Sequence, residues 1–211
     1  MTSFRDRPDA GRALARRLLE AGTLPTVVLG LPRGGVPVAA EVAGALHAPL
    51  DVFVVRKLGV PGHRELAMGA VASGGVRVLN ERLVASLSIP PAAIEAVAGD
   101  EARELARREA AYRSGRPALD LAGADVLLVD DGLATGATMR AAIEAVRQLG
   151  PNSVTVGVPV GAQATCNELA AVADAIVCVE SPANFYAVGQ WYDDFTQTHD
   201  DEIVRLLAAN P

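Results

Sequence analysis

Short runs of β-branched and other apolar residues recur along the chain, and stretches with apolar residues at helical spacing separate them. Continuous apolar runs of this length are typical of strands buried on both faces, while an apolar stripe with a period of 3.6 predicts an amphipathic helix. The predicted strands cover residues 26–31, 51–56, 67–72, 76–80, 126–130, 153–160 and 174–180. The predicted helices cover residues 8–21, 36–48, 138–149 and 165–173, with a further helical segment over 81–115, and residues 57–66 are predicted to form a loop.

The alternation of strands and helices indicates the fold class. It predicts βαβ units, which place parallel strands side by side with helices on both faces of the sheet. We therefore expect an α/β fold with a mainly parallel, twisted sheet, formed by residues 1–211 as a single domain. A chain of 211 residues with 50% apolar content is long enough to bury a sizeable core.

Composition narrows the range of partners and compartments. The formal net charge is −6 and no basic block occurs, which argues against a general binder of duplex DNA. Cys166 and Cys178 fit neither a metal-binding spacing nor a disulfide framework, so we interpret them as buried thiols in a reducing compartment. The N-terminal segment is too charged for a secretory signal, and no apolar run is long enough to span a membrane. A cytoplasmic protein is expected.

The stretch VLLVDDGLATGATM at residues 126–139 carries the clearest chemistry. Ligands of parallel sheets bind at the carboxyl ends of strands, where Asp130 and Asp131 stand, and Asp131 is expected to be exposed. The small residues at 134–138 offer backbone N–H groups at the start of a helix, and such groups bind phosphate. The two carboxylates suit sugar hydroxyls or Mg²⁺. A ligand with a phosphate beside a diol is a ribose 5-phosphate.

Other interpretations of this stretch fit less well. A Walker-type loop requires a lysine where Ala137 stands, and a dinucleotide fingerprint requires G-x-G-x-x-G, which neither GLATGA nor GLPRGG supplies. The two aspartates could instead cap the helix, but one would be enough, and a capping residue stands directly at the helix start.

The same stretch resembles the phosphoribosyl pyrophosphate signature of type I phosphoribosyltransferases. It is most similar to the adenine phosphoribosyltransferase version, DDLLATGGTM, and departs from it at Gly132 and Ala137 without losing a functional group. The resemblance implies that Asp130 and Asp131 are catalytic residues and that both bind Mg²⁺ as the cofactor. The residues that it implies for the 5′-phosphate are Ala134, Thr135, Gly136, Ala137 and Thr138. It covers about residues 24–160, leaving the helical segment 81–115 as an insertion.

The segment GLPRGGVPVA at residues 30–39 resembles the pyrophosphate loop of the same family. By position, Arg33, Gly34 and Gly35 would hold the diphosphate through a basic side chain and exposed backbone N–H groups. Non-proline cis peptides persist at functional sites, and the resemblance predicts one near Pro32–Arg33. The alternative is a simple Gly-Gly turn with a solvated arginine.

The segment VVRKLGVPGHRELAMG at residues 54–69 resembles the basic segment and the flexible catalytic loop of the adenine enzymes. Lys57 would reach the pyrophosphate, supported by Arg56, and the loop would close over the reacting centre and exclude water. The alternative is a mobile surface loop with a solvated lysine.

The C-terminal segment 180–211 is expected to form a small hood that selects the acceptor base. NFYAVGQWYDD at residues 184–194 resembles the segment FVVGYALDY of the hypoxanthine-guanine enzymes, which stacks an aromatic ring on the purine. By position Tyr186 would stack on the base, Asp193 would match the acid that follows, and Trp191 would complete the base-binding set. A packed hydrophobic lid is the alternative for Phe185, Trp191 and Phe195.

The acid and base groups of the familiar purine enzymes are missing. The strand after the signature helix reads VGVPVG without the lysine of the 6-oxopurine enzymes, and Ala134 stands where they place an aspartate. The Glu-Tyr pair of the adenine enzymes is replaced by AVASGG. The acceptor is therefore not expected to be a routine adenine or guanine. Glu65, His63 and Asp193 are the candidates for proton transfer, and Glu65 is included among the catalytic residues.

The resemblance implies a magnesium-dependent transferase and homodimer that moves phosphoribosyl from phosphoribosyl pyrophosphate to a nitrogen heterocycle. The rival hypothesis is a regulator that binds the same ligand with little or no transferase activity, since some members bind RNA. A third interpretation uses the site for hydrolysis or salvage of a ribosyl phosphate. The net charge argues against RNA, and the arginines of the helical segment are interleaved with glutamates, which predicts a salt-bridged helix face. These residues are Arg103, Arg107, Arg108 and Arg113 with Glu101, Glu104 and Glu109.

Overall fold

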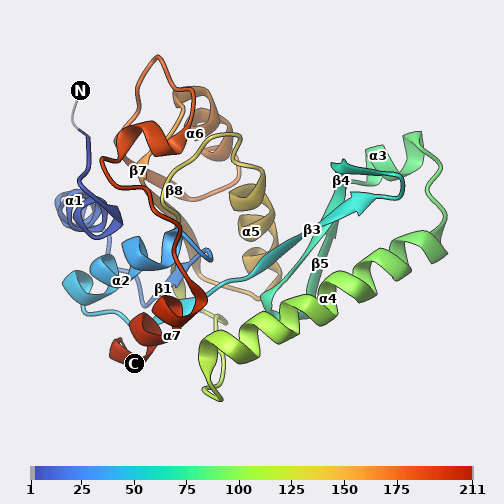
Figure 1. Cartoon of the computed structure of the whole chain (residues 1–211), viewed down its shortest axis with the longest axis horizontal. Helices are drawn as coiled ribbons and strands as arrows, with labels where there is room; N and C mark the ends of the chain where they lie inside the picture. The colour runs from blue at the N-terminus through green and yellow to red at the C-terminus, as the bar shows by residue number, and fades with distance from the viewer. Residues whose placement is uncertain (1–2, 211) are drawn as a thin grey trace.

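The computed structural model describes residues 3–210 and contains two β-sheets (Figure 1). The larger sheet has five strands, all parallel, in the order β2-β1-β6-β7-β8. Its strands are β1 (Val27–Gly30), β2 (Leu50–Val52), β6 (Asp125–Val129), β7 (Ser153–Val160) and β8 (Ala175–Glu180). The smaller sheet is antiparallel, in the order β3-β4-β5, and consists of β3 (Val55–Val60), β4 (His63–Ala72) and β5 (Val76–Leu79). The predicted α/β fold with a mainly parallel sheet is confirmed.

Helices cover both faces of the parallel sheet. Val28 and Leu127 point to the face packed by α1 and α2, whereas the next residues along each strand, Leu29 and Leu128, point to the face packed by α5 and α6. Side chains alternate between the faces of a strand, so strands buried on both faces need continuous apolar sequence. The helices are α1 (Arg7–Glu20), α2 (Gly35–Leu46), α3 (Glu81–Ser86), α4 (Pro91–Arg113), α5 (Ala137–Gln148), α6 (Gln163–Leu169) and α7 (Asp200–Ala209).

Two predictions for residues 51–66 are wrong. The run at 51–56 is divided between sheets, because β2 ends at Val52 and β3 begins at Val55. The predicted loop 57–66 is a hairpin in which β3 and β4 pair around a tight turn at Pro61 and Gly62, with register shifts near Gly59. Glycines and charges in this segment suggested a loop, but cross-strand backbone hydrogen bonds form irrespective of those side chains. The C-terminal helix α7 was not predicted.

The helical segment 81–115 forms α3 and α4, and α4 packs along the antiparallel sheet (Figure 1). Its interleaved charges pair with one another, as in Arg107–Glu104 at 2.7 Å and Arg108–Glu104 at 2.8 Å. The predicted salt-bridged helix face is confirmed. Arg113 also anchors α4 to the parallel sheet, because its buried guanidinium lies 2.9 Å from the carboxylate of Asp51.

Two further observations concern the cysteines and the length and apolarity of the helices. Cys166 is buried and Cys178 is half-buried, and both thiols are free. No helix formed by residues 3–210 is long and apolar enough to cross a membrane.

Candidate functional site

The paired aspartates lie at the carboxyl end of β6, against the loop that follows β1. A Cβ atom on Gly34 would overlap the carboxylate of Asp131, and one on Gly35 would lie 2.6 Å from the carbonyl oxygen of Val129 and 2.8 Å from Cα of Asp130. The loop and the aspartates can meet only because both positions are glycine. The peptide bond between Pro32 and Arg33 is cis, as predicted.

The two half-buried carboxylates lie side by side, which changes their acidity. Burial, followed by repulsion from Asp131, raises the pKa of Asp130 well above its ordinary value. Burial also raises the pKa of Asp131, although the guanidinium of Arg7 opposes this rise. Arg7 Nε donates to Asp131 Oδ2 at 2.8 Å, and the side chain of Asp131 is only 15% exposed. The expectation of an exposed Asp131 is therefore wrong, because the first residue of α1 covers it.

The loop at 134–138 has the geometry of a phosphate cradle. Gly136 adopts a left-handed conformation (φ +68°) and α5 begins at the next residue. Within the part of the chain that the structure describes, the backbone N–H groups of 134–138 donate no hydrogen bond. A side chain fixes the loop instead, because Thr165 Oγ1 donates to the carbonyl oxygen of Ala134 at 2.6 Å. The free N–H groups at a helix start are thus preorganised for an anion.

Ribose 5-phosphate is expected to bind at this loop through backbone N–H groups. Its addition should slow amide hydrogen exchange, or shift the amide resonances, of residues 134–138 more than those of the rest of α5. Gly136→Val is the matched variant, because a side chain there would lie 2.6 Å from Cγ2 of Thr165 and would need a left-handed conformation. We expect it to abolish these changes. Protection that appears elsewhere while this loop is unaffected at saturating ligand would contradict the assignment.

Lys57 and the groups predicted around it lie on the hairpin. Lys57 is exposed on β3, and its Nζ donates to the backbone carbonyl of Glu65 at 3.1 Å. The exposed side chain of Glu65 lies 3.5 Å from His63 Nδ1. Arg56 does not accompany Lys57, because its Nε donates to Glu101 of α4 at 2.8 Å. The predicted support of Lys57 by Arg56 is therefore absent in this conformation.

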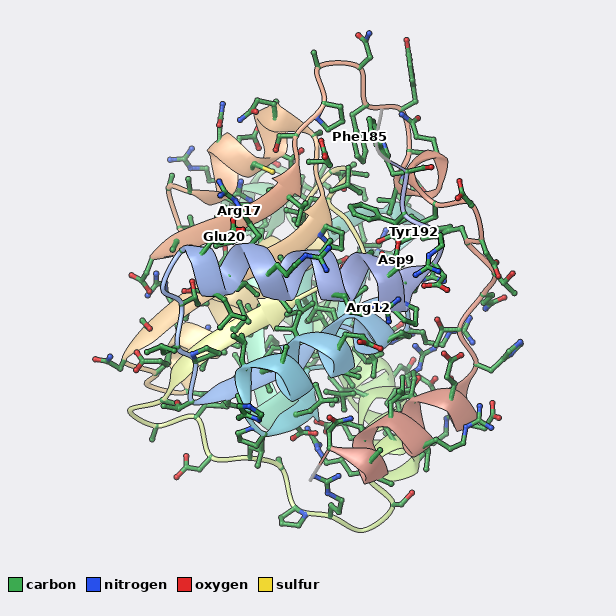
Figure 2. All side chains as sticks on the ribbon, turned by 90° about the vertical axis from the view of Figure 1, so that its left-hand side faces the viewer. Asp9, Arg12, Arg17, Glu20, Phe185 and Tyr192 are labelled. Atoms are coloured by element: carbon green, nitrogen blue, oxygen red, sulfur yellow. The ribbon has the colours of Figure 1, made fainter. Side chains whose placement is uncertain are left out.

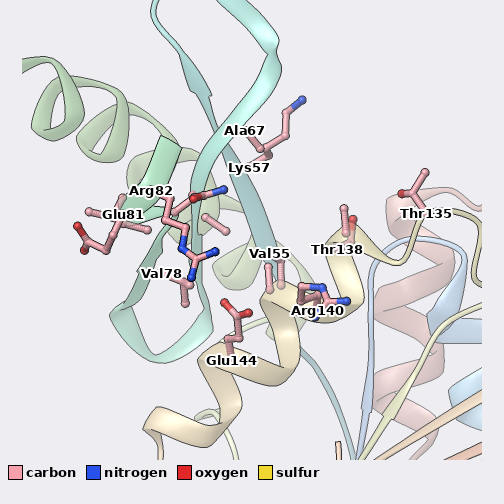
Figure 3. Close-up of a pocket in the computed structure, with 16 residues that line it drawn as sticks. Val55, Lys57, Ala67, Val78, Glu81, Arg82, Thr135, Thr138, Arg140 and Glu144 are labelled. Carbon is pink, nitrogen blue, oxygen red and sulfur yellow. The ribbon is translucent and has the colours of Figure 1, made fainter. Parts of the chain in front are cut away.

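A groove of about 640 Å³ separates the antiparallel sheet from α5 (Figure 3). Val55 and Val78 form part of its apolar lining, and Lys57, Thr135 and Thr138 stand at one rim. The aspartates do not line it. The groove thus connects Lys57 with the loop 134–138 and leaves open space between them.

Arg33 points toward the C-terminal helix in this structure. Its Nη1 lies 3.8 Å from the carboxylate of Asp200 at the start of α7, and both side chains are substantially exposed. This ion pair contributes little to stability, because both side chains are exposed to solvent. The Arg33 side chain is therefore available to bind a diphosphate beside the loop that follows β1.

The residues predicted for base binding differ in exposure. Tyr186 is 87% exposed, and Asp193 is exposed with its Oδ1 accepting from Ser3 Oγ at 2.9 Å. Trp191 is only 4% exposed and packs with Phe4 and Val160. The packed-lid alternative therefore applies to Trp191, whose ring has no free face for a base in this structure.

Two residues next to the aspartates were not predicted. Arg7 binds the side chain of Asp131, and Tyr192 Oη donates to the backbone carbonyl of the same residue at 2.6 Å. Figure 2 shows Tyr192 beside the N-terminal end of α1. Arg7 lies outside the predicted motifs, and Tyr192 lies within the segment 184–194 but has no predicted role there. Only the fold brings them to the aspartates.

The carboxylate oxygens of Asp130 and Asp131 fit a divalent cation that also binds water and substrate phosphates. Asp130 and Asp131 provide adjacent oxygen donors, and one arginine balances only part of their charge. No cluster of three or more His, Cys, Asp or Glu side chains that could hold a metal occurs within residues 3–210. Mg²⁺ commonly binds in this way, through one or two carboxylates, water and substrate phosphates. Bound magnesium stays a prediction.

The family model, the relatives and the solved structure that this chain matches agree with one another. A family model described as "Phosphoribosyl transferase domain" matches residues 5–196. Two Mycobacterium tuberculosis proteins, MT0597 (strain CDC 1551 / Oshkosh) and Rv0571c (strain ATCC 25618 / H37Rv), each provisionally named a phosphoribosyl transferase, are 51% identical over 207 residues. The matches cover 98% of this chain and 47% of each relative, so the chain spans about half the length of these relatives. The crystal structure of TT1426 from Thermus thermophilus is 43% identical, covers 99% of both chains and superposes with a TM-score of 0.89.

Proposed function

Because this chain belongs to the phosphoribosyl transferase family, we propose that it transfers the 5-phosphoribosyl group of phosphoribosyl pyrophosphate to a nitrogen heterocycle. The bond from the anomeric carbon to the heterocycle nitrogen forms while the bond to the pyrophosphate oxygen breaks. Pyrophosphate leaves with the electron pair of that bond. This activity is proposed for the domain described, since the relatives are about twice as long.

The contact between two segments that are far apart in the sequence carries this proposal. The glycine loop after β1 meets the aspartates after β6, and the free N–H groups of 134–138 follow these aspartates directly along the chain. A phosphate on the N–H groups would leave its ribose beside the carboxylates and its pyrophosphate beside Gly34 and Gly35. That order matches the order of groups along phosphoribosyl pyrophosphate.

The charges of the site suit a leaving pyrophosphate. Lys57 and Arg33 would bind its oxygens, where negative charge increases in the transition state. Magnesium, held by the pyrophosphate together with Asp130 and Asp131, would supply further stabilisation of that charge. The carboxylates accept hydrogen bonds from the ribose hydroxyls and so orient the anomeric carbon. Glu65 remains a candidate for proton transfer, because its exposed side chain stands on the hairpin near Lys57.

A panel of bases and other nitrogen heterocycles, each supplied with phosphoribosyl pyrophosphate and Mg²⁺, tests the proposal. We expect at least one compound to stimulate pyrophosphate release, and Asp130→Asn to reduce that release roughly 100-fold or more. Tight binding of phosphoribosyl pyrophosphate without release in the presence of any base would favour the regulatory alternative. Absence of binding would reject both.

Tyr186 is expected to stack on the acceptor. The neighbouring Val188 approaches Gly132 so closely that a Cβ there would lie 2.6 Å from Val188 Cγ1, which puts this segment over the signature loop. Tyr186→Ala should raise the Michaelis constant for the acceptor about tenfold, because stacking contributes about 1–3 kcal/mol per base. Affinity for phosphoribosyl pyrophosphate should change little.

Tyr186→Phe is the matched control and should be nearly silent if the ring, and not the hydroxyl, makes the contact. A Tyr186→Ala variant that loses thermal stability and binds both ligands more weakly would instead indicate a packing role.

A further inference from the structure

Arg7 makes three contacts through one guanidinium group. Its Nε donates to Asp131 Oδ2 at 2.8 Å, its Nη1 donates to the backbone carbonyl of Thr196 at 2.6 Å, and its central carbon lies 4.1 Å from the ring centre of Phe195. The side chains of Arg7 and Asp131 are only 11% and 15% exposed. A planar group with donors in a fixed fork can satisfy an acceptor on each side while stacking on a ring, and lysine cannot.

The two ends of the described chain hold Arg7 in this place. Phe4 N donates to the carbonyl of Trp191 and Asp193 N donates to the carbonyl of Phe4, both at 2.8 Å. Tyr192 packs against Phe195, with ring centres 5.0 Å apart, and its hydroxyl binds the carbonyl of Asp131. The segment before α1 and the segment before α7 therefore meet over Asp131.

The pair also touches the loop after β1. A Cβ atom on Gly34 would lie 3.1 Å from Arg7 Nε as well as overlapping Asp131. Arg7 is thus packed between the loop that is predicted to bind pyrophosphate and the aromatic ring of the C-terminal segment.

Arg7 uses one of the two carboxylate oxygens of Asp131. Within residues 3–210, its hydrogen bond to Oδ2 is the only one that a residue outside the aspartate pair donates to this side chain. An ion pair that served only to join the two terminal segments would not require the carboxylate that contacts Gly34 of the loop after β1.

We propose that Arg7 is a positioning residue of the phosphoribosyl site, which holds Asp131 through Oδ2 and presents Oδ1 to the ribose hydroxyls. This inference rests on the proposed function. Without Arg7 the carboxylate rotates freely and the contact with Gly34 is lost, so the ribose is less well oriented. Within the described residues Arg7 makes no hydrogen bond to 134–138, so binding of inorganic phosphate there should not depend on it.

Arg7→Gln, Arg7→Lys and the control Arg12→Gln test the inference. Arg12 stands on the same helix, is 43% exposed and pairs with Asp9 and Glu41 at 3.4 Å, away from the aspartates. Calorimetry with phosphoribosyl pyrophosphate plus Mg²⁺, and separately with inorganic phosphate, should be combined with melting temperatures.

We expect Arg7→Gln to weaken binding of phosphoribosyl pyrophosphate about tenfold or more, with inorganic phosphate affinity unchanged. With an accepted base, the Michaelis constant for phosphoribosyl pyrophosphate should rise more than kcat falls, because a ribose contact is present before and during the reaction. Arg7→Lys should recover part of the loss, since it keeps the charge without the fork. Arg12→Gln should match the wild type.

Equal weakening of both ligands by Arg7→Gln, or a lower melting temperature with unchanged phosphoribosyl pyrophosphate affinity, would show that the pair only joins the termini and would overturn the inference. If Arg7→Gln does not fold, Arg7→Lys decides: wild-type affinity for phosphoribosyl pyrophosphate would reject the positioning role. Failure of the proposed function would be a separate result: the wild-type protein would not bind phosphoribosyl pyrophosphate at all.

Discussion

Asp130→Asn is expected to raise the melting temperature while reducing phosphoribosyl transfer roughly 100-fold or more. Asp130 is half-buried beside a second carboxylate, and the pair has one arginine to balance it. Asparagine has the same shape and can still accept the hydrogen bond that Asp131 N donates to Oδ1 at 2.9 Å. Removing the buried charge should therefore stabilise the unliganded fold by about 1–2 kcal/mol, or about 2–8 °C for a domain of this size.

The partial burial of Asp130 also makes the stability of the unliganded protein depend on pH in a definite direction. The pKa of Asp130 is raised in the folded state above its ordinary value of 3.8, so the folded state holds this proton more tightly than the unfolded state. The contribution of Asp130 to stability therefore increases as pH falls through the raised pKa toward 3.8, and decreases as pH rises through it. Asp130→Asn removes this contribution, so its advantage over the wild type should shrink as the solution is acidified.

Asp125→Asn is the matched control, because Asp125 stands at the opposite end of β6. Hydrogen bonds from Ser153 and Asn152 lower the pKa of this carboxyl, so its ionised form is favoured in the fold and its neutralisation should give no gain in melting temperature. Thermal unfolding of the two variants between about pH 5 and pH 8 makes the comparison. An Asp130→Asn variant that melts below the wild type at neutral pH would show that this carboxylate stabilises the fold, contrary to the charge balance described above.

Lys57→Ala is expected to lower kcat for pyrophosphate release about 100- to 1,000-fold with an unchanged melting temperature. Removal of a single group that stabilises developing negative charge typically has an effect of about this size. The exposed side chain of Lys57 makes one hydrogen bond, to the carbonyl of Glu65, and stands at the rim of the groove that leads to the phosphate loop. Its loss should leave the packing of β3 intact.

Arg77→Ala controls for the loss of a positive charge on the same sheet. Arg77 stands on β5, is 39% exposed and pairs with Glu95 of α4 at 2.7 Å. Its removal should leave kcat within about twofold of the wild type, since exposed ion pairs contribute little. Wild-type turnover by Lys57→Ala would remove this lysine from the mechanism, and equal losses in both variants would indicate a general effect of the charge of the sheet.

The features that were predicted correctly depend on residues close together in the sequence. Small residues after a buried strand and before a helix predict the turn at Gly136 and its free N–H groups, whatever the rest of the chain does. The cis peptide at Pro32–Arg33 came from the resemblance of a single short loop. Continuous apolar runs predict doubly covered strands for the same reason, because the burial of both faces requires them.

The features that were missed depend on distant partners. Residues 57–66 form a hairpin because β3 finds cross-strand partners in β4 and a covering helix in α4, and neither is visible in the glycines and charges of the segment itself. Trp191 is buried because Phe4 and Val160 pack on it, not because of its own neighbours in the motif.

The sequence by itself determined the parallel α/β sheet, the turn at Gly136 before α5 and the order along the chain of the segments predicted to bind a ligand. Only the tertiary structure decided the state of Asp131, which is half-buried and paired with Arg7, a residue 124 positions away in the sequence. Periodicity and turn chemistry are local properties, so they can be deduced from neighbouring residues. Burial and charge pairing depend on which segments the fold brings into contact, and these determine the acidity and the accessible oxygens of the site.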